Sequence, residues 1–497
     1  MGSENEVRFL LDTNVGIQLE EVEKKSGQIR QSFRTFSELC HRYGIKLFYH
    51  PDSQIDISND KDETRQRATK SRFRKYPALT NFPHGEVSEL EELFKPIDSS
   101  NDLVDCQILY SIKRDCIEYL VSEDIGLHKR ASYAGLNERV FTVDEAINFL
   151  QRNFSSEHSN FPNTEKVNLK KIDFNEPFFD SLKADYGSFL TWFKGMQDKG
   201  EEAWVIREND KIAAICIIED KGYGKLSYRP DHKTLKVCTF KVGLEHTGQK
   251  YGELLLKSLF SYCIHENYDL VYLTTFPKQA PLIYVLRDFG FSLGPKPRNN
   301  GELELFKTFT PPPVTHPRVD PLKFHIAWSP YYYDDRKIEK YIIPIQPQYH
   351  DILFPEIRSI TPLFEDSNKI PPGNTIKKVY LCHSPTKSIE TGSLILFYRS
   401  SSEKNLTTLA IVEETFRSDD YFKVMKEIGK RSVYSSAEIR DIVKKETMVI
   451  KFRLIKHLPK QFTLSELISL KVLKSAPFSI TSISHDAYLS LKINPGN

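Results

Sequence analysis

The chain has 497 residues, of which 39% are hydrophobic, and this length predicts about three domains with substantial cores. Its 69 basic and 67 acidic residues give a formal net charge of only +2. The near balance excludes a nucleic-acid binder that acts through overall charge, so any basic surface must be local.

The seven cysteines lie scattered in apolar stretches, without a CxxC pair or a zinc-ligand spacing. This pattern is typical of buried thiols in a reducing compartment. The sequence has no secretory signal, and no apolar run approaches membrane-spanning length. We therefore expect a cytoplasmic protein.

Strands and helices alternate along the first 150 residues. Short apolar strands are predicted at residues 7–11, 45–50, 117–121 and 139–142. Helical segments are predicted at residues 15–43, at residues 61–75, from Ser99 onward and at residues 143–150. This alternation is typical of a doubly wound parallel sheet, in which ligands bind beyond the carboxyl ends of the strands.

Acidic residues occupy the positions where such a site would form. Asp12 and Asp124 each follow a predicted strand, and Asp56 begins the segment after another. Asp105 lies on the apolar stripe of a helix, where an isolated carboxylate is costly to bury. Four converging carboxylates need a cation between them, and oxygen ligands without His or Cys favour Mg²⁺ or Mn²⁺. Each acid alone is equally compatible with an ordinary turn or helix cap.

The motifs FLLDTN, HPDSQID, NDLVDCQIL and LVSED, in this order, resemble the PIN-domain ribonucleases over residues 5–150. The resemblance implies a metal-dependent endoribonuclease. The catalytic metal ligands that it implies are Asp12, Asp56, Asp105 and Asp124. Asn14 and Glu123 would support them, and Asp52 and Asp60 compete with Asp56 for the second position. The basic run at residues 61–75 would contact RNA, with Arg65 and Arg72 as the named candidates.

Two segments predict domain boundaries. Residues 151–169 are rich in Ser, Asn, Glu and Lys and are interpreted as a linker. Residues 308–321, TFTPPPVTHPRVDP, predict a semi-rigid, Pro-rich spacer. The resulting domains are expected at residues 1–150, 170–307 and 322–497.

The middle domain is expected to open with helix 178–200 and a strand pair, and then to form a strand at residues 237–242. This strand leads through a loop with Gly248 and Gly252 into an amphipathic helix. The first turn of such a helix has unpaired N–H groups that bind anions, and glycine lets a phosphate approach the backbone. Two glycines before a helix are also compatible with a plain turn.

Further along, a strand at residues 270–273 precedes a helix that contains Tyr284 and ends at Phe289-Gly290-Phe291, followed by a strand at 302–307. Together these features resemble the acetyl-CoA-dependent GNAT acetyltransferases over residues 170–307. The resemblance implies that strand 237–242 pairs with the pantetheine arm and that loop 246–252 holds the pyrophosphate. It also implies that Tyr284 protonates the departing thiolate, although a core position on an amphipathic helix would equally place an aromatic residue there.

The cofactor contacts implied by the resemblance fall on the strand, the loop and the first turn of the helix: Cys238, Phe240, Val242, Thr247, Gly248, Gln249, Lys250, Tyr251 and Gly252. The sequence departs from the family at two of them. Thr247 and Lys250 stand where an Arg and a middle Gly are usual, a difference that bears on cofactor affinity.

The last third predicts short strands and a few helices, compatible with a small β-barrel decorated by helices. The pattern ETGSLILFYRS, LTTLAIVEET and GKRSVYSSAEIRD resembles the PUA-like group, in particular its ASCH and EVE branches, over residues 374–456. The resemblance implies binding of RNA or a modified base. Lys430, Arg431 and Tyr434 combine charge with an aromatic ring, as RNA contacts often do, although a solvated basic loop gives the same pattern.

The expected fold is α/β multidomain: a PIN-like doubly wound parallel sheet, a GNAT-like mixed sheet and a PUA-like β-barrel with helices. The leading functional hypothesis is an RNA-directed enzyme that joins a Mg²⁺- or Mn²⁺-dependent endoribonuclease to an acetyl-CoA-dependent N-acetyltransferase, in a toxin-like, defence or tRNA-directed role. One alternative is an acetyltransferase of a protein or small molecule whose PIN-like domain is inert. The other is a non-catalytic RNA-binding adaptor.

Overall fold

The computed structural model describes residues 7–493 apart from the gaps at 23–30, 55–65, 67–74, 138, 155–163, 209–210, 224–225, 227–228, 244–245, 247–249, 312–319, 355, 358–374, 402–403, 429–430, 432–433 and 435. The described chain divides into two compact units. The first contains the N-terminal residues together with residues 419–444, and the second contains most of the rest. Among the described residues, no helix has both the length and the apolarity needed to cross a membrane.

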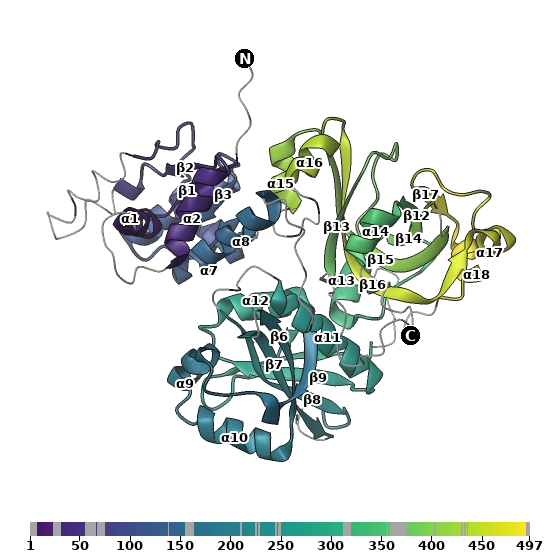
Figure 1. Ribbon diagram of the computed structural model, residues 1–497, viewed down its shortest axis with the longest axis horizontal. Coiled ribbons are helices and arrows are strands. Elements are labelled where there is room, and N and C mark those ends of the chain that lie inside the picture. The colour runs from purple at the N-terminus through teal and green to yellow at the C-terminus, as the bar shows by residue number, and fades with distance from the viewer. Residues whose placement is uncertain are drawn as a thin grey trace. The chain divides into compact units, whose positions relative to one another are not determined.

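The first unit is built on a four-stranded parallel sheet in the order β2-β1-β3-β4. Its strands are β1 (Arg8–Leu11), β2 (Lys46–Tyr49), β3 (Tyr119–Val121) and β4 (Val140–Phe141). Its helices are α1 (Thr13–Val22), α2 (Gln31–Arg42), α5 (Val87–Phe94), α6 (Ser100–Lys113), α7 (Ile125–Tyr133) and α8 (Val143–Phe154). The parallel sheet expected from the alternation of strands and helices is therefore present, and Figure 1 shows it among its helices.

Both faces of this sheet are covered by helices. Side chains alternate across a strand, so neighbouring residues of β1 face opposite layers. The Phe9 ring packs against Phe36 of α2 and Phe149 of α8. Leu10 instead belongs to the apolar cluster that contains Leu90 of α5 and Leu109 of α6. The domain is thus a three-layer α/β/α structure.

Residues 419–444 pack on this sheet although they lie between two strands of the C-terminal domain. They form α15 (Tyr421–Ile428) and α16 (Ser436–Ile442). The Tyr119 hydroxyl donates to the Met425 carbonyl at 3.0 Å, and Lys426 forms an ion pair with Asp115. The expected C-terminal domain, residues 322–497, is therefore interrupted by a segment that belongs to the first unit.

The central domain contains a seven-stranded sheet in the order β10-β11-β9-β8-β7-β6-β5. Its strands are β5 (Thr164–Asn168), β6 (Glu202–Glu208), β7 (Lys211–Gly222), β8 (Thr234–Val242), β9 (Leu270–Thr275), β10 (Ser292–Leu293) and β11 (Leu303–Thr308). β5 lies inside the segment expected to be a linker, so that expectation was wrong for residues 164–168.

Helices cover both faces of the central sheet (Figure 1). They are α9 (Asp180–Asp185), α10 (Phe189–Lys199), α11 (Tyr251–His265) and α12 (Ala280–Asp288). Leu259 of α11 and Leu286 of α12 join one apolar cluster with the sheet. Phe193 of α10 joins another with Val205 and Ile215, whose side chains point to the opposite face.

The C-terminal domain contains a six-stranded mixed sheet in the order β13-β16-β15-β14-β12-β17. Its strands are β12 (Lys340–Ile345), β13 (Lys377–Cys382), β14 (Leu394–Arg399), β15 (Asn405–Ser418), β16 (Thr447–Thr463) and β17 (Thr481–Ile483). Its helices are α13 (Pro321–Trp328), α14 (Pro347–Leu353), α17 (Leu464–Ser469) and α18 (His485–Ser490). Within the described residues the outer strands β13 and β17 do not pair with each other, so the sheet is open where a closed barrel was expected.

Candidate functional site

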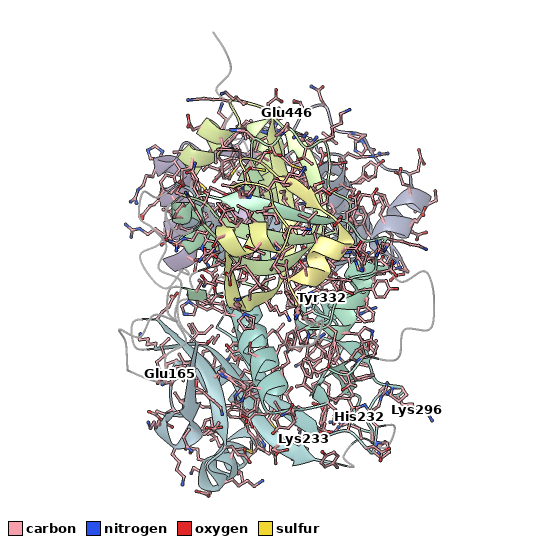
Figure 2. The ribbon with its side chains drawn as sticks, turned by 90° about the vertical axis from the view of Figure 1, so that its right-hand side faces the viewer. Glu165, His232, Lys233, Lys296, Tyr332 and Glu446 are labelled. Carbon is pink, nitrogen blue, oxygen red and sulfur yellow. The ribbon has the colours of Figure 1, made fainter. Side chains whose placement is uncertain are left out.

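The central sheet splits between β8 and β9. These strands are the only parallel pair in the described part of the sheet, and their pairing ends at Val237 and Leu273. β8 continues to Val242 and β9 to Thr275 without further pairing between them. The pairing of β8 with β9 begins at Thr234, directly after His232 and Lys233, which are labelled in Figure 2. The split therefore opens at the carboxyl ends of two parallel strands, where ligands bind in α/β sheets.

A bulge on β8 coincides with the start of this split. Ile217 of β7 pairs with Thr239 and Ile218 pairs with Val237, which leaves Cys238 as the extra residue. Such a bulge re-aims the strand after it. Cys238 therefore marks the point at which β8 turns away from β9.

The polar backbone groups of β8 that point into the split can be derived from its register. The Gly243 N–H donates to the Ala213 carbonyl at 2.8 Å, so this residue faces β7. In an antiparallel pair, hydrogen-bonded and non-hydrogen-bonded positions alternate along the strand. Phe240 and Val242 are consequently directed away from β7, toward the side where β9 has diverged. Their N–H and C=O groups form a strand edge that can accept an extended amide-containing ligand.

The first turn of α11 lies over the same two residues. A Cβ atom placed on Gly252 would come within 3.6 Å of Phe240 and 3.8 Å of Val242. The helix begins after Lys250, whose backbone adopts a left-handed conformation (φ 65°) and whose side chain does not cap the helix. The first helical hydrogen bond joins the Leu254 N–H to the Lys250 carbonyl, so the preceding N–H groups lie outside the helical ladder. An anion at this helix end would meet these donors.

Three side chains brace the start of α11, a role that sequence patterns alone did not reveal. Tyr251 is buried and its hydroxyl donates to Glu208 at the end of β6. The Nδ1 atom of His246 lies 3.2 Å from the same carboxylate, and its ring stacks on Tyr251. His246 and Tyr251 therefore both approach one carboxylate, which links β6 to the start of α11. The only sequence feature at this point is that Glu208 precedes a hairpin turn, and acidic residues at such turns are too common to indicate a site.

The segment that contains α9 lies close to both strands that border the split. Lys241 of β8 contacts the Phe178 carbonyl and lies 2.6 Å from the Ser181 hydroxyl. On the β9 side, Lys278 pairs with Asp185 at 3.2 Å. Residues 178–185 are thus held to each side of the opening by a lysine.

Tyr284 lies on α12, the helix that follows β9. Its neighbours Leu282, Ile283, Val285 and Leu286 pack on the core, while Tyr284 is 42% exposed. The exposure argues against the alternative that Tyr284 is simply a core aromatic residue. Nearly half of the tyrosine side chain is therefore open to solvent.

Residues 167–291 match the sequence model of the Acetyltransferase (GNAT) family. The central domain is a GNAT acetyltransferase domain. Residues 374–472 match a second model, that of the domain of unknown function DUF365. None of the curated proteins compared with the chain matches it.

Solved structures resemble single domains of the chain. One is an ASCH protein from Zymomonas mobilis, with 18% identity, 32% of this chain and 95% of that chain covered, and a TM-score of 0.24. Another is a GNAT family acetyltransferase from Elizabethkingia anophelis with acetyl-CoA bound, with 15% identity, coverages of 30% and 99%, and a TM-score of 0.23. The family match over residues 167–291 and the mixed sheet identify the GNAT domain.

Several of the predicted contacts of the GNAT domain can be placed. Phe240, Val242 and Gly252 lie close together at the split. Tyr251 is buried, and its hydroxyl donates to Glu208. Cys238 packs on the α10 side of the sheet, and burial raises the pKa of its thiol to about 12, so it is a neutral core residue. Thr247, Gly248 and Gln249 lie outside the described residues.

The acidic residues of the first unit were expected to converge on a metal ion. Asp12 is 5% exposed and accepts hydrogen bonds from the Ser122 hydroxyl at 2.7 Å and from the Thr13 N–H at 2.6 Å. Burial raises the pKa of Asp12, and the charge of Asp124 raises it further, so these two carboxylates interact. Asp124 also caps α7 by accepting from the Leu127 N–H at 2.9 Å.

The rest of the expected metal site is not brought together by the described residues. Among these residues no group of three or more His, Cys, Asp or Glu side chains could hold a metal ion. Asp105 lies on α6 and is half-buried. Asp56 falls outside the described residues. The described acids therefore do not support the Mg²⁺ or Mn²⁺ that the PIN-like interpretation requires.

Two of the residues expected to contact RNA, Arg431 and Tyr434, can be placed. Tyr434 is 3% exposed, so its ring cannot serve as a surface platform on which a base stacks, and that expectation was wrong. Arg431 and Tyr434 belong to the first unit and not to the C-terminal sheet. Arg65, Arg72 and Lys430 lie outside the described residues.

Proposed function

We propose that the protein is an acetyl-CoA-dependent N-acetyltransferase. The observation that carries this proposal is the exposed edge of β8 at Phe240 and Val242, which lies beside the uncapped first turn of α11. A strand edge suits the amide-containing pantetheine arm, and the helix start suits its pyrophosphate. The match to the GNAT family model over residues 167–291 supports the same activity.

In this proposal acetyl-CoA supplies an activated acetyl group as a thioester. The amine of the acceptor attacks the thioester carbonyl, so that a C–N bond forms and the C–S bond breaks. Tyr284 donates its hydroxyl proton to the departing sulfur, which leaves poorly as a thiolate. The proton that the amine loses passes to solvent and restores the tyrosine hydroxyl. The partial exposure of Tyr284 allows this exchange.

The surroundings of the split favour a cationic acceptor. Tyr186 follows α9 and stacks on Phe276, just after β9, at 6.2 Å between ring centroids. Burial raises the pKa of Tyr186, and the negative charges of Glu302 and Asp185 add to that rise, so both carboxylates lie close to the ring. Asp185 is already paired with Lys278, so the Glu302 carboxylate and the ring faces are the groups that attract an ammonium group.

Transfer of radiolabelled acetyl groups tests the proposal. The purified protein is incubated with labelled acetyl-CoA and, in separate reactions, with a protein extract, a panel of small amines and total RNA. We expect label in an amine-containing fraction and none when the protein is boiled. Label in no fraction, despite measured binding of acetyl-CoA, would restrict the domain to cofactor binding and contradict the proposed transfer.

A second function, cleavage of RNA, is favoured by one arrangement in the first unit. Asp12 and Asp124 follow the parallel strands β1 and β3 and interact beside Ser122. We propose that these two acids contribute to a Mg²⁺- or Mn²⁺-dependent site that cleaves RNA, with tRNA as one candidate. Metal-dependent cleavage of labelled RNA by the wild-type protein tests it, and inactivity with both metals across structured and unstructured RNA would contradict it.

The C-terminal domain is proposed to bind RNA or a modified base. This proposal is supported by the resemblance of residues 374–456 to the ASCH and EVE branches of the PUA-like group. The family model that matches residues 374–472 describes a domain of unknown function. The first unit and the C-terminal domain would then both act on RNA, and we propose that they do so in the cytoplasm. Binding by the full-length protein should weaken steeply as salt rises, because phosphate contacts release counterions.

A further inference from the structure

The C-terminal end of α12 meets a buried arginine of the C-terminal domain. The Arg453 side chain, on β16, is 3% exposed and contacts Asp288 twice. Its Nη2 donates to the Asp288 carboxylate at 2.7 Å, and its Nη1 donates to the Asp288 backbone carbonyl at 2.8 Å. Its Nε donates to Glu413 at 2.6 Å. Because the guanidinium is a rigid fork of donors, these contacts fix both the position and the direction of the helix end.

A second cation completes this ionic cluster. The Nζ atom of Lys377, on β13, lies 3.0 Å from the Asp288 carboxylate and 3.5 Å from that of Glu413. Asp288, Glu413, Lys377 and Arg453, which we call the Asp288 cluster, thus contain two negative and two positive charges. In a buried cluster of this kind, loss of one member leaves an uncompensated charge.

The same segment of the C-terminal domain also holds α11. The Lys377 N–H donates to the Glu253 carboxylate at 2.7 Å. Glu253 is 4% exposed and lies in the first turn of α11, next to Gly252. Ile376, just before β13, packs against the core of the GNAT domain. Ile376 and Lys377, which we call the β13 wedge, therefore contact α11, α12 and the core between them.

The turn after α12 is fixed from another side. Gly290 adopts a φ of 87°, and a Cβ atom there would lie 1.9 Å from the Ile326 carbonyl of α13. Lys307 of β11 donates to the Ile326 and Ala327 carbonyls, both at 3.1 Å. Backbone contact this close leaves α12 no freedom to shift without disturbing the C-terminal domain.

We propose that the β13 wedge and Arg453 position α11 and α12 for acyl transfer, so that the C-terminal domain is part of the acetyltransferase. Tyr284 precedes Asp288 by one helical turn, so a displacement at Asp288 moves the tyrosine hydroxyl as well. Glu253 lies next to Gly252, so a displacement there moves the phosphate site. Lys377 and Arg453 are positioning residues, since they act through the two helices, and the inference rests on the proposed function.

The test uses the full-length protein with Lys377→Met, which removes the ammonium group but keeps the backbone N–H for Glu253. Lys377→Arg is the conservative variant, and Lys451→Met is the matched control. The Lys451 side chain is 17% exposed, close to the 15% of Lys377, and forms an ion pair with Glu414 inside the C-terminal domain at 2.9 Å. For each variant, kcat, the Kd for acetyl-CoA and the hydrogen exchange of α11 and α12 are measured.

Lys377→Met is expected to lower kcat by about 10-fold to 100-fold, the usual effect of a small misplacement in an active site. It should also speed exchange in α11 and α12, and Lys377→Arg should restore most of both properties. Lys451→Met should change neither. If Lys377→Met does not fold, Asp288→Asn replaces it, because the amide keeps the shape and one acceptor for Arg453.

The outcomes separate the inference from the proposed function. Absence of acetyl-CoA binding by the wild-type protein would overturn the proposed function and, with it, the catalytic part of the inference. The hydrogen-exchange measurement would still show whether the β13 wedge holds α11 and α12. Normal binding with equal kcat and equal exchange in Lys377→Met and Lys451→Met would overturn the inference alone.

Discussion

Val237 and Leu273 form the last backbone pair between β8 and β9, and beyond them the two strands separate. The separation leaves a strand edge at Phe240 and Val242 beside the first turn of α11. Strand edge and helix start are both made of backbone groups, so their chemistry does not depend on the side chains of the loop. This explains how a site with Thr247 and Lys250 in place of the usual Arg and Gly can still be expected to bind acetyl-CoA.

Gly252→Asp should abolish binding of acetyl-CoA, because it sets a carboxylate against the proposed phosphate position. Gly252→Ala is the matched variant without charge, and the surrounding space of 3.6 to 3.9 Å admits its methyl group. We expect Gly252→Ala to retain binding within about 10-fold of the wild-type Kd, a difference of about 1.4 kcal/mol. Calorimetry measures both.

A control for added charge elsewhere is Gly195→Asp. Gly195 lies on α10, and nothing lies within 4 Å of a Cβ atom placed there. This variant should bind acetyl-CoA like the wild type. Equal binding by Gly252→Asp and Gly195→Asp would place the phosphates away from α11.

Tyr284→Phe should separate binding from chemistry. The phenyl ring keeps the packing of α12, so the Kd for acetyl-CoA should not change, while kcat should fall by about 100-fold or more, the usual contribution of a general acid. Steady-state kinetics and calorimetry provide the two numbers. Tyr223→Phe, at another exposed tyrosine, is the control, and an equal kcat for both variants would contradict the role of Tyr284.

Asp12→Asn should abolish any metal-dependent RNA cleavage by the first unit. It should also stabilise the fold at neutral pH, because burial raises the pKa of Asp12 and the ionised carboxylate is therefore destabilising. The sign follows from linkage: with a raised folded-state pKa, the destabilisation exists above that pKa and disappears as the pH falls below the unfolded value. The stability difference between variant and wild type should thus shrink toward acidic pH.

Urea unfolding at several pH values measures this difference, with exposed Asp98 as the site of the control substitution Asp98→Asn. If Asp12→Asn instead unfolds at a lower urea concentration than the wild type at neutral pH, the ionised Asp12 carboxylate is stabilised by positive charge outside the described residues.

Lys307 should make the second unit more stable as the pH rises into the alkaline range. Burial, with a smaller effect from the charge of Arg453, lowers the pKa of Lys307 to about 7. The unfolded chain holds this proton up to about pH 10, so stability should rise between about pH 7 and 10, by at most about 1.4 kcal/mol per pH unit. Lys307→Met should remove this rise, and an unchanged pH dependence of unfolding in the variant would contradict it.

The sequence predicted those features that depend on local patterns. Alternating strands and helices indicated the parallel sheet of the first unit, and Gly252 with the following apolar spacing indicated the start of α11. β5 was missed because it pairs on one side only, and its sequence TEKVN is mostly polar. Edge strands of this kind resemble linkers when they are viewed without their neighbours.

Features that depend on long-range contacts were out of reach. The packing of residues 419–444 on the first unit rests on contacts such as Tyr119 with Met425, which are 306 residues apart. Tyr434 is 3% exposed, so a ring that looked like a surface contact is part of the interior. The Asp288 cluster also joins residues from distant strands, and none of its members stands out in the sequence.

Binding of acetyl-CoA to the wild-type protein, measured by isothermal titration calorimetry, tests the central claim most directly. We expect saturable binding of one acetyl-CoA per chain, weakened by salt because backbone donors and nearby charge would hold the pyrophosphate. We also expect that Gly252→Asp removes the signal. No detectable binding by the wild-type protein, with a related acetyltransferase as a positive control, would contradict the claim.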